Sequence, residues 1–193
     1  MKIPIAAILV SFLLHSCNNH HAKTPTEPAN IVVEKQRFFP VTDYIKGQLF
    51  ELNKRGVNPL KYHTVNNRTD SNWLKQEDIP QAIDEFLHPE IDSVNLVSLF
   101  TEKKFMDQSI DAYTLSYDAT GPLPDSMTLK HWDVYIDPAS GNVRRIYMVK
   151  TVGESKTIQL TWQSNKWCKT TVLLNKPDGT TLIEKEEKIT WDF

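Results

Sequence analysis

Histidines and carboxylates are the residues of this chain whose chemistry could support acid–base catalysis. His63, His88 and His131 stand far apart in the sequence, in unrelated contexts. His131 precedes Trp132 and Asp133, and strand alternation turns it to the face opposite Trp132, as a half-exposed sheet histidine. His88 ends a predicted helix, where a cation complements the negative end of the helix dipole. We therefore expect structural roles for both His131 and His88.

The sequence lacks the motifs that usually build catalytic or metal sites. It contains no Gly-x-Ser-x-Gly elbow, no His-Glu-x-x-His, no glycine-rich phosphate loop and no paired cysteines with metal-site spacing. We expect no enzyme activity and no metal or cofactor, because a catalytic site needs several groups in agreed roles. A hydrolase is the least favoured hypothesis, and it would require His131 or His88 beside a nucleophile in a cleft.

The five tryptophans could contribute to a binding surface, because aromatic rings bind sugars and apolar molecules well. Trp132, Trp162 and Trp191 have the inward parity of their predicted strands, so we expect them in the core. Trp73 and Trp167 are the better candidates for a surface role.

Arg144 and Arg145 place one guanidinium on each face of a predicted strand. At least one of them should pair with an acid, and Asp133 on the opposite strand is a plausible partner. The predicted ligand or partner surface therefore comprises Trp73, Trp167, His131 and Arg144.

The first residues have the pattern of a secretory signal. Lys2 precedes an apolar run from Ile3 to Leu14, which is too short to span a bilayer. The run ends in Leu14-His15-Ser16-Cys17, which resembles the lipobox of bacterial lipoproteins, although that family usually has a small or aliphatic residue at the position of His15. The resemblance implies that residues 1–16 are removed and that Cys17 is lipidated. An ordinary secretory signal is the alternative.

Lipidation would anchor the mature protein stably, because the cysteine of that family carries two or three acyl chains and one chain alone binds membranes only marginally. In many Gram-negative lipoproteins an Asp after the cysteine marks retention in the inner membrane, and here Asn18 takes its place. The resemblance therefore implies a lipid anchor in a Gram-negative cell envelope, at the outer membrane and facing the periplasm.

The predicted mature chain divides into two parts. Residues 17–36 have the composition of a flexible tether, with a root-mean-square reach of roughly 25 Å, and residues 37–193 are long enough for a single domain. With Cys17 lipidated, Cys168 lacks a disulfide partner, and we expect it to be a small buried hydrophobe. A formal net charge of −2, without a basic run, argues against a nucleic-acid partner.

Two helical segments are expected near the start of the domain. Thr42 can cap a helix over about 42–55, which Gly56 ends. A second helical region starts with a turn capped by Ser71 and continues with a helix from Pro80 to His88.

Strands are expected from Val94 onward, after a possible short strand around 61–65. The clearest is a hairpin over 129–150, whose turn is Asp137-Pro138-Ala139-Ser140-Gly141. The last strand carries Lys185 and Glu187 among apolar residues, which suits a protected edge. We predict an α+β domain, an antiparallel β-meander of about seven strands packed with two N-terminal helical segments. The pattern does not decide between an open sheet and a barrel.

Residues 134–143 also resemble a hairpin of the PepSY family of secreted modules, but the hairpin type is common and implies no function. The leading hypothesis is a non-enzymatic envelope lipoprotein whose domain binds a protein or another envelope component. The alternative is a carrier of a lipid or other apolar ligand under a curved sheet, as in lipoproteins of the LolB type. The inward residues should distinguish the two hypotheses by filling the core or lining a void, namely Leu115, Ile146, Leu160 and Val172.

Overall fold

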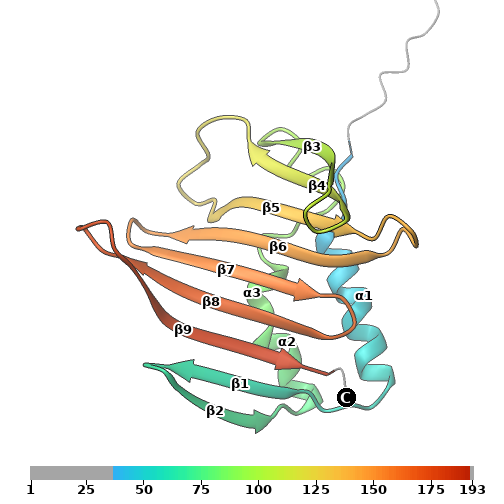
Figure 1. The fold of residues 1–193 in the computed structure, drawn as a ribbon, viewed down its shortest axis with the longest axis vertical. Helices are drawn as coiled ribbons and strands as arrows, with labels where there is room; N and C mark the ends of the chain where they lie inside the picture. Colours follow the sequence, from blue (N-terminus) through green and yellow to red (C-terminus); the bar gives the residue numbers. More distant parts are fainter. Residues whose placement is uncertain (1–36, 192–193) are drawn as a thin grey trace, which may run out of the picture. The chain divides into compact units, whose positions relative to one another are not determined.

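The structure, a computed structural model, describes residues 37–191. These residues form one antiparallel sheet of nine strands with helices over one face (Figure 1). The strands are β1 (Leu60–Val65), β2 (Arg68–Trp73), β3 (Phe100–Asp107), β4 (Ala112–Ala119), β5 (Leu129–Ile136), β6 (Val143–Val152), β7 (Lys156–Gln163), β8 (Trp167–Asn175) and β9 (Thr181–Thr190). The helices are α1 (Val41–Lys54), α2 (Ile79–Ala82) and α3 (Asp84–Leu87), with a 3₁₀ turn, η1 (Gln76–Asp78). The predicted signal peptide (1–16) and the tether (17–36) with Cys17 lie outside the described residues.

From β3 to β9 each strand pairs with the next along the chain, which is the predicted meander. The β1–β2 hairpin adds beside β9, so the order is β2-β1-β9-β8-β7-β6-β5-β4-β3 and the sheet is open. This largely antiparallel sheet with a few short helices fits the α+β class. The prediction of about seven strands was wrong, because β1 and β2 join the sheet.

The helical turn predicted at Ser71 was wrong because this segment is paired as β2. Asn66 and Asn67 both adopt positive φ, 49° and 59°, and close a two-residue turn between Val65 and Arg68. Such a turn matches the twist of two antiparallel strands. The local turn therefore brings residues 68–73 alongside β1.

Two strand predictions were also wrong. The apolar alternation from Val94 predicted a strand, yet strand pairing begins only at Phe100, and the amide of Phe100 donates to the carbonyl of Leu96 in a preceding turn. The last strand, β9, is not an edge: it pairs with β8 on one side and with β1 on the other. Its charged residues form ion pairs within the sheet instead of protecting an edge.

Helix α1 begins one residue earlier than predicted, and Pro40 occupies its N-cap position. Thr42 is not the cap. Its hydroxyl accepts a hydrogen bond from the Ile91 amide at 2.8 Å, and its own amide donates to the Ile91 carbonyl at 3.1 Å. Gly56 follows the helix with φ of 66°, as the predicted stop requires. Among residues 37–191 no helix is long and apolar enough to cross a membrane.

The core lies between the helices and one face of the sheet. The Trp132 ring stacks on Tyr117 at 4.5 Å between centroids, and Phe100 and Phe38 meet it edge-on. Trp162 packs on Phe86 and Trp191. The prediction that three tryptophans lie in the core is thus confirmed, and several other predicted inward residues are buried there too, namely Leu115, Ile146, Leu160 and Cys168.

Candidate functional site

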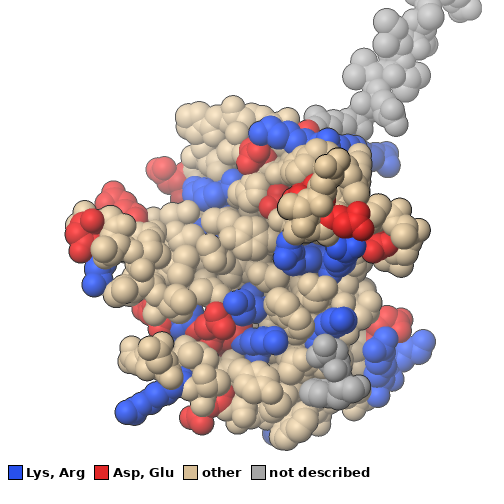
Figure 2. Space-filling model, in the orientation of Figure 1, with Lys and Arg blue, Asp and Glu red and all other residues tan. Residues whose placement is uncertain are grey.

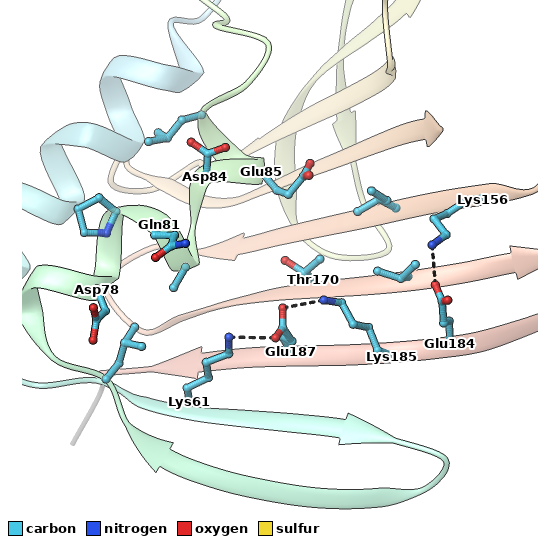
Figure 3. A pocket seen from close by; sticks show the side chains of 16 residues that line it. Lys61, Asp78, Gln81, Asp84, Glu85, Lys156, Thr170, Glu184, Lys185 and Glu187 are labelled. Carbon is cyan, nitrogen blue, oxygen red and sulfur yellow. Dashed lines mark ion pairs between the residues drawn. The ribbon is translucent and has the colours of Figure 1, made fainter. Parts of the chain in front are cut away.

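A cleft of about 1010 Å³ opens between the short helices and the helix-facing side of the sheet (Figure 3). Its floor comes from the neighbouring strands β7, β8, β9 and β1, and consists of Lys61, Lys156, Ile158, Thr170, Val172, Glu184, Lys185 and Glu187. Its wall comes from the segment with η1, α2 and α3, and consists of Leu74, Asp78, Pro80, Gln81, Ala82, Asp84, Glu85 and Leu87.

Strand register explains how charged residues come to the cleft floor. On β7, alternation gives Lys156 the same face as the buried residues Ile158 and Trp162. Cross-strand pairing places Thr170 beside Glu187, again on the helix-facing side. The face that carries the core therefore continues into the cleft as a charged surface.

Glu187 is the residue of the cleft floor around which several basic side chains gather. Its Oε1 lies 2.9 Å from Lys61 Nζ and 3.2 Å from His63 Nδ1, and its Oε2 lies 3.4 Å from Lys185 Nζ. Burial alone would raise the pKa of Glu187, but the lysines outweigh burial and hold this pKa below its usual value. Glu187 is thus ionised at neutral pH, whereas a general acid needs a raised pKa.

The helical wall of the cleft is acidic. It presents Asp78, Asp84 and Glu85 together with the amide of Gln81, and no lysine or arginine of the wall lines the cleft (Figure 3). Over the whole lining, five carboxylates face three ammonium groups, a formal charge of −2. The lysines are already paired, since Lys156 also binds Glu184 at 2.9 Å. The wall therefore favours cationic groups on a ligand.

The cleft also has an apolar part. Ile158 and Val172 pair across β7 and β8 on the floor, and Leu74 is buried at the edge of the wall. Ala82 and Leu87 add apolar contact from α2 and α3. A ligand with both apolar and cationic groups would match this lining.

A smaller cleft of about 320 Å³ adjoins the first on the other side of Glu85. Lys150 of β6 lines this smaller cleft, and its exposed fraction is only 3%. Its ammonium donates to Glu85 Oε2 at 2.8 Å and to the Glu85 carbonyl oxygen. The Lys150–Glu85 pair therefore ties α3 to the sheet between the two clefts.

His131 lies on the helix-free face of the sheet, opposite Trp132 as predicted, and does not line either cleft. Its Nδ1 is 2.9 Å from Asp118 Oδ1 and its Nε2 is 3.0 Å from Asp133 Oδ2. The hydrogen bond to Asp133 outweighs desolvation and raises the pKa of His131, with Asp118 adding to the effect. Both ring nitrogens thus lie within hydrogen-bonding distance of a carboxylate oxygen, which leaves neither directed at an open site for general-base catalysis.

The other predicted surface residues also lie outside the clefts. Trp73 is 63% exposed, and Trp167 packs under the Lys188 ammonium at 5.1 Å. Strand pairing through β1 and β9 gives both tryptophans the helix-free face. On that face acidic and basic side chains are interspersed over a largely uncharged surface (Figure 2).

Arg144 pairs with an acid, as expected for one of the two arginines, but its partner is Asp137 at 2.9 Å. Asp133 was the wrong partner, because register places it opposite Tyr147. Arg145 instead stacks over the Tyr135 ring at 4.2 Å. The predicted surface therefore does not converge on one site.

Sequence reasoning missed the cleft. A signal was present, because Lys156, Lys185 and Glu187 share their parity with buried residues, and charged groups on an inward face need a solvent-filled opening or partners. The same charges on β9 were interpreted as edge protection.

No family model, curated protein sequence or solved structure matches this chain. Among residues 37–191 no group of three or more His, Cys, Asp or Glu side chains is arranged to hold a metal ion. What the cleft can bind therefore follows from its own side chains.

Proposed function

We propose that this chain is a lipid-anchored protein of a Gram-negative cell envelope, whose domain binds an envelope component in the cleft without converting it chemically. The favoured ligand is a basic, amphipathic segment of an envelope protein. The observation that carries the proposal is the cleft itself, in which an acidic wall faces an apolar patch formed by Ile158 and Val172.

The states of the titratable groups favour binding over catalysis. Glu187 is held ionised by the lysines around it, and His131 is held between two carboxylates away from either cleft. His88 contacts Asp84 at 3.1 Å at the end of α3, in agreement with a structural role. His88 does line the smaller cleft, together with Ser126 and Thr128. Its contacts are to Asp84 and not to either hydroxyl, so a hydrolase is the least supported of the three hypotheses.

The lipid anchor is supported by the lipobox resemblance that ends at Cys17, and Asn18 supports the outer membrane. Mass spectrometry of the protein extracted from its own membranes tests the anchor directly. Chains that begin at Cys17 and carry two or three acyl groups are expected, and an unmodified Cys17 would disprove the anchor.

The alternative ligand class, a lipid or other apolar molecule, has weaker support. Leu115, Ile146 and Leu160 are packed in the core, and of the four inward residues only Val172 lines the cleft. The ion pairs around Glu187 on the cleft floor would be desolvated by an acyl chain, which is costly. A stoichiometric lipid that co-purifies with the protein would favour this alternative.

The binding experiment uses two fluorescent probe peptides, one of alternating leucine and lysine and one with glutamate in place of lysine. The lysine peptide should bind more tightly, because the wall is acidic and the cleft lining has an excess of carboxylates. Thr170→Trp, which places a large ring on the cleft floor, should weaken binding of the lysine peptide at least tenfold. Fluorescence anisotropy measures both affinities.

Thr161→Trp is the matched control, because Thr161 lies on β7 next to β8, with the opposite parity to Leu160 and Trp162. It makes the same chemical change on the helix-free face and should leave affinity unchanged. Equal binding of the two peptides, or equal loss of binding in the two variants, would refute the cleft as a site for basic segments.

A further inference from the structure

Four large apolar side chains are exposed around the tip of the β3–β4 hairpin, with Met106 and Tyr113 on the helix-facing side and Phe105 on the helix-free side. The exposed fractions of Phe105, Met106, Ile110 and Tyr113 are between 38% and 45%. Met106 and Tyr113 are direct cross-strand partners, and Ile110 lies in the turn between the strands. Exposed apolar side chains gathered on both faces of one hairpin tip can form a contact site.

The hairpin tip is held in place by polar contacts that do not cover these side chains. Arg144 donates to the carbonyl oxygens of Ile110 and Asp111 at 2.9 and 3.0 Å, and it also binds Asp137. Within the turn, Asp107 accepts hydrogen bonds from the amide and hydroxyl of Ser109. The apolar residues are therefore presented by a fixed turn.

The described chain begins beside β4, and α1 starts near the strand ends that carry the hairpin tip. The Phe39 amide donates to the Tyr117 hydroxyl of β4 at 3.1 Å, just after Phe38, whose ring meets Tyr117 edge-on at 5.0 Å. At the start of α1, the Tyr44 hydroxyl contacts the carbonyl oxygen of Val143, the residue before Arg144. The described part of the chain therefore begins on the helix-facing side of β4, and the sequence continues back from there to Cys17.

We propose that the tip of the β3–β4 hairpin rests in the headgroup layer of the membrane in which Cys17 is anchored. This inference rests on the lipid anchor of the proposed function. A tether over residues 17–36, with its reach of roughly 25 Å, keeps the domain close enough to the bilayer for the contact. Tyr113 suits this position, because tyrosine rings prefer the level of the headgroups. The acyl chains supply the affinity and the hairpin sets the orientation of the domain.

This orientation has a consequence for the cleft. Five strand spacings separate β4 from β9, a distance of roughly 24 Å across the sheet. Lys156 and Glu184 of the cleft floor also lie near the opposite ends of their strands from the hairpin. The cleft therefore lies on the side of the domain away from the anchoring bilayer. Proteins of the periplasm can reach it there more readily than lipids of that bilayer.

The experiment places an environment-sensitive fluorophore on the full-length, membrane-extracted protein through Ile110→Cys, and through Ile183→Cys as a control. Ile183 is 64% exposed and lies at the start of β9, toward the strand ends opposite the hairpin. The buried Cys168 should not react, and the parent protein reports any labelling at Cys17. Each protein is reconstituted into vesicles of phosphatidylethanolamine and phosphatidylglycerol that contain lipids with nitroxide headgroups.

The nitroxide should quench the probe at position 110 at least twofold more than the probe at position 183. Met106→Ser combined with Tyr113→Ser should reduce quenching at position 110, because these changes remove apolar contact with the bilayer. Equal quenching at the two positions on a protein whose Cys17 is acylated would overturn the docking proposal while leaving the anchor intact. An unmodified Cys17 in the mass spectrum would overturn both the lipid anchor and the membrane docking of the hairpin. The peptide-binding assay tests the cleft as a ligand site independently of either result.

Discussion

The two halves of the sheet use the same inward face in opposite ways. In the packed half, β4 and β5 bring Tyr117 and Trp132 together in a stacked pair that is fully buried. In the cleft half, β8 and β9 bring Thr170 and Glu187 together on the same face, where they line an opening. Strand β7 belongs to both, since Trp162 lies in the core and Lys156 lies at the cleft.

The difference shows that strand alternation determines which side chains point to the inward face of the sheet. It does not determine which helices or loops pack over that face. Strands β4 and β5 are covered by the segment around Phe38, while the 14-residue helix α1 crosses behind one end of β6 to β9 (Figure 1). At the cleft, the strands face the short elements η1, α2 and α3, which have three or four residues each. Short helices bury little surface. The strands beneath them therefore carry charged side chains on the inward face, where solvent still reaches them.

The largest expected difference between the halves concerns stability. Trp132→Ala should lower the free energy of unfolding by about 3–5 kcal/mol, because it leaves a cavity among packed aromatic rings. Thr170→Ala, at the cleft floor, should change it by no more than about 0.5 kcal/mol. Urea denaturation of the two variants measures both values. Similar losses would mean that the cleft half is packed as tightly as the core.

The boundary between the halves should show an intermediate effect. Glu85→Gln removes the carboxylate that pairs with the buried Lys150 ammonium and should cost about 2 kcal/mol. Lys150→Met should cost less, because it removes the charge and keeps an unbranched chain of similar length. Urea denaturation ranks the two variants. A greater loss for Lys150→Met would show that the ammonium itself contributes to stability.

A smaller, acid-sensitive effect is expected in the cleft half. The pKa of Glu187 is lowered in the folded state, so its contribution to stability is present above its ordinary pKa of 4.5 and is lost as pH falls through the lower folded value. Glu187→Gln should cost about 1 kcal/mol at neutral pH. This cost should disappear in denaturation curves measured at progressively lower pH. A constant cost would rule out the ion pairs as its source.

The smallest effect should have the opposite pH dependence, on the helix-free face of the packed half. The pKa of His131 is raised by Asp133 and Asp118, so its contribution is present below its ordinary pKa of 6.5 and is lost as pH rises through the higher folded value. The difference in unfolding free energy between the protein and His131→Gln, about 0.5 kcal/mol, should shrink as the pH rises from the ordinary pKa of 6.5 through the higher folded value. A difference that grows with pH would contradict the paired imidazolium.

Much of the packed half could be predicted from local pattern. The hairpin of β5 and β6 follows from alternation and from a turn in which Asp137 accepts amide hydrogen bonds and Gly141 adopts φ of 71°. The inward positions of Trp132 and Trp162 follow from the same parity. These features depend on neighbours within a few residues, so the sequence contains what is needed to predict them.

The candidate site could not be predicted in the same way. Trp73, Trp167 and His131 were chosen for their residue types, but all three lie on the helix-free face. The cleft depends on where the β1–β2 hairpin pairs, because β1 beside β9 brings Lys61 within 2.9 Å of Glu187 across more than one hundred residues of chain.

Local patterns were enough to predict α1, the β5–β6 hairpin, the inward parity of the strands and the lipobox resemblance at Cys17, because turn chemistry, periodicity and short motifs depend on near neighbours in the sequence. Only the tertiary structure decided that β9 is an interior strand, that Arg144 holds the β3–β4 turn and that charged inward residues line a cleft. The physical reason is that a side chain's environment is set by what packs against it. For Glu187 that environment comes from strands and helices distant in the sequence.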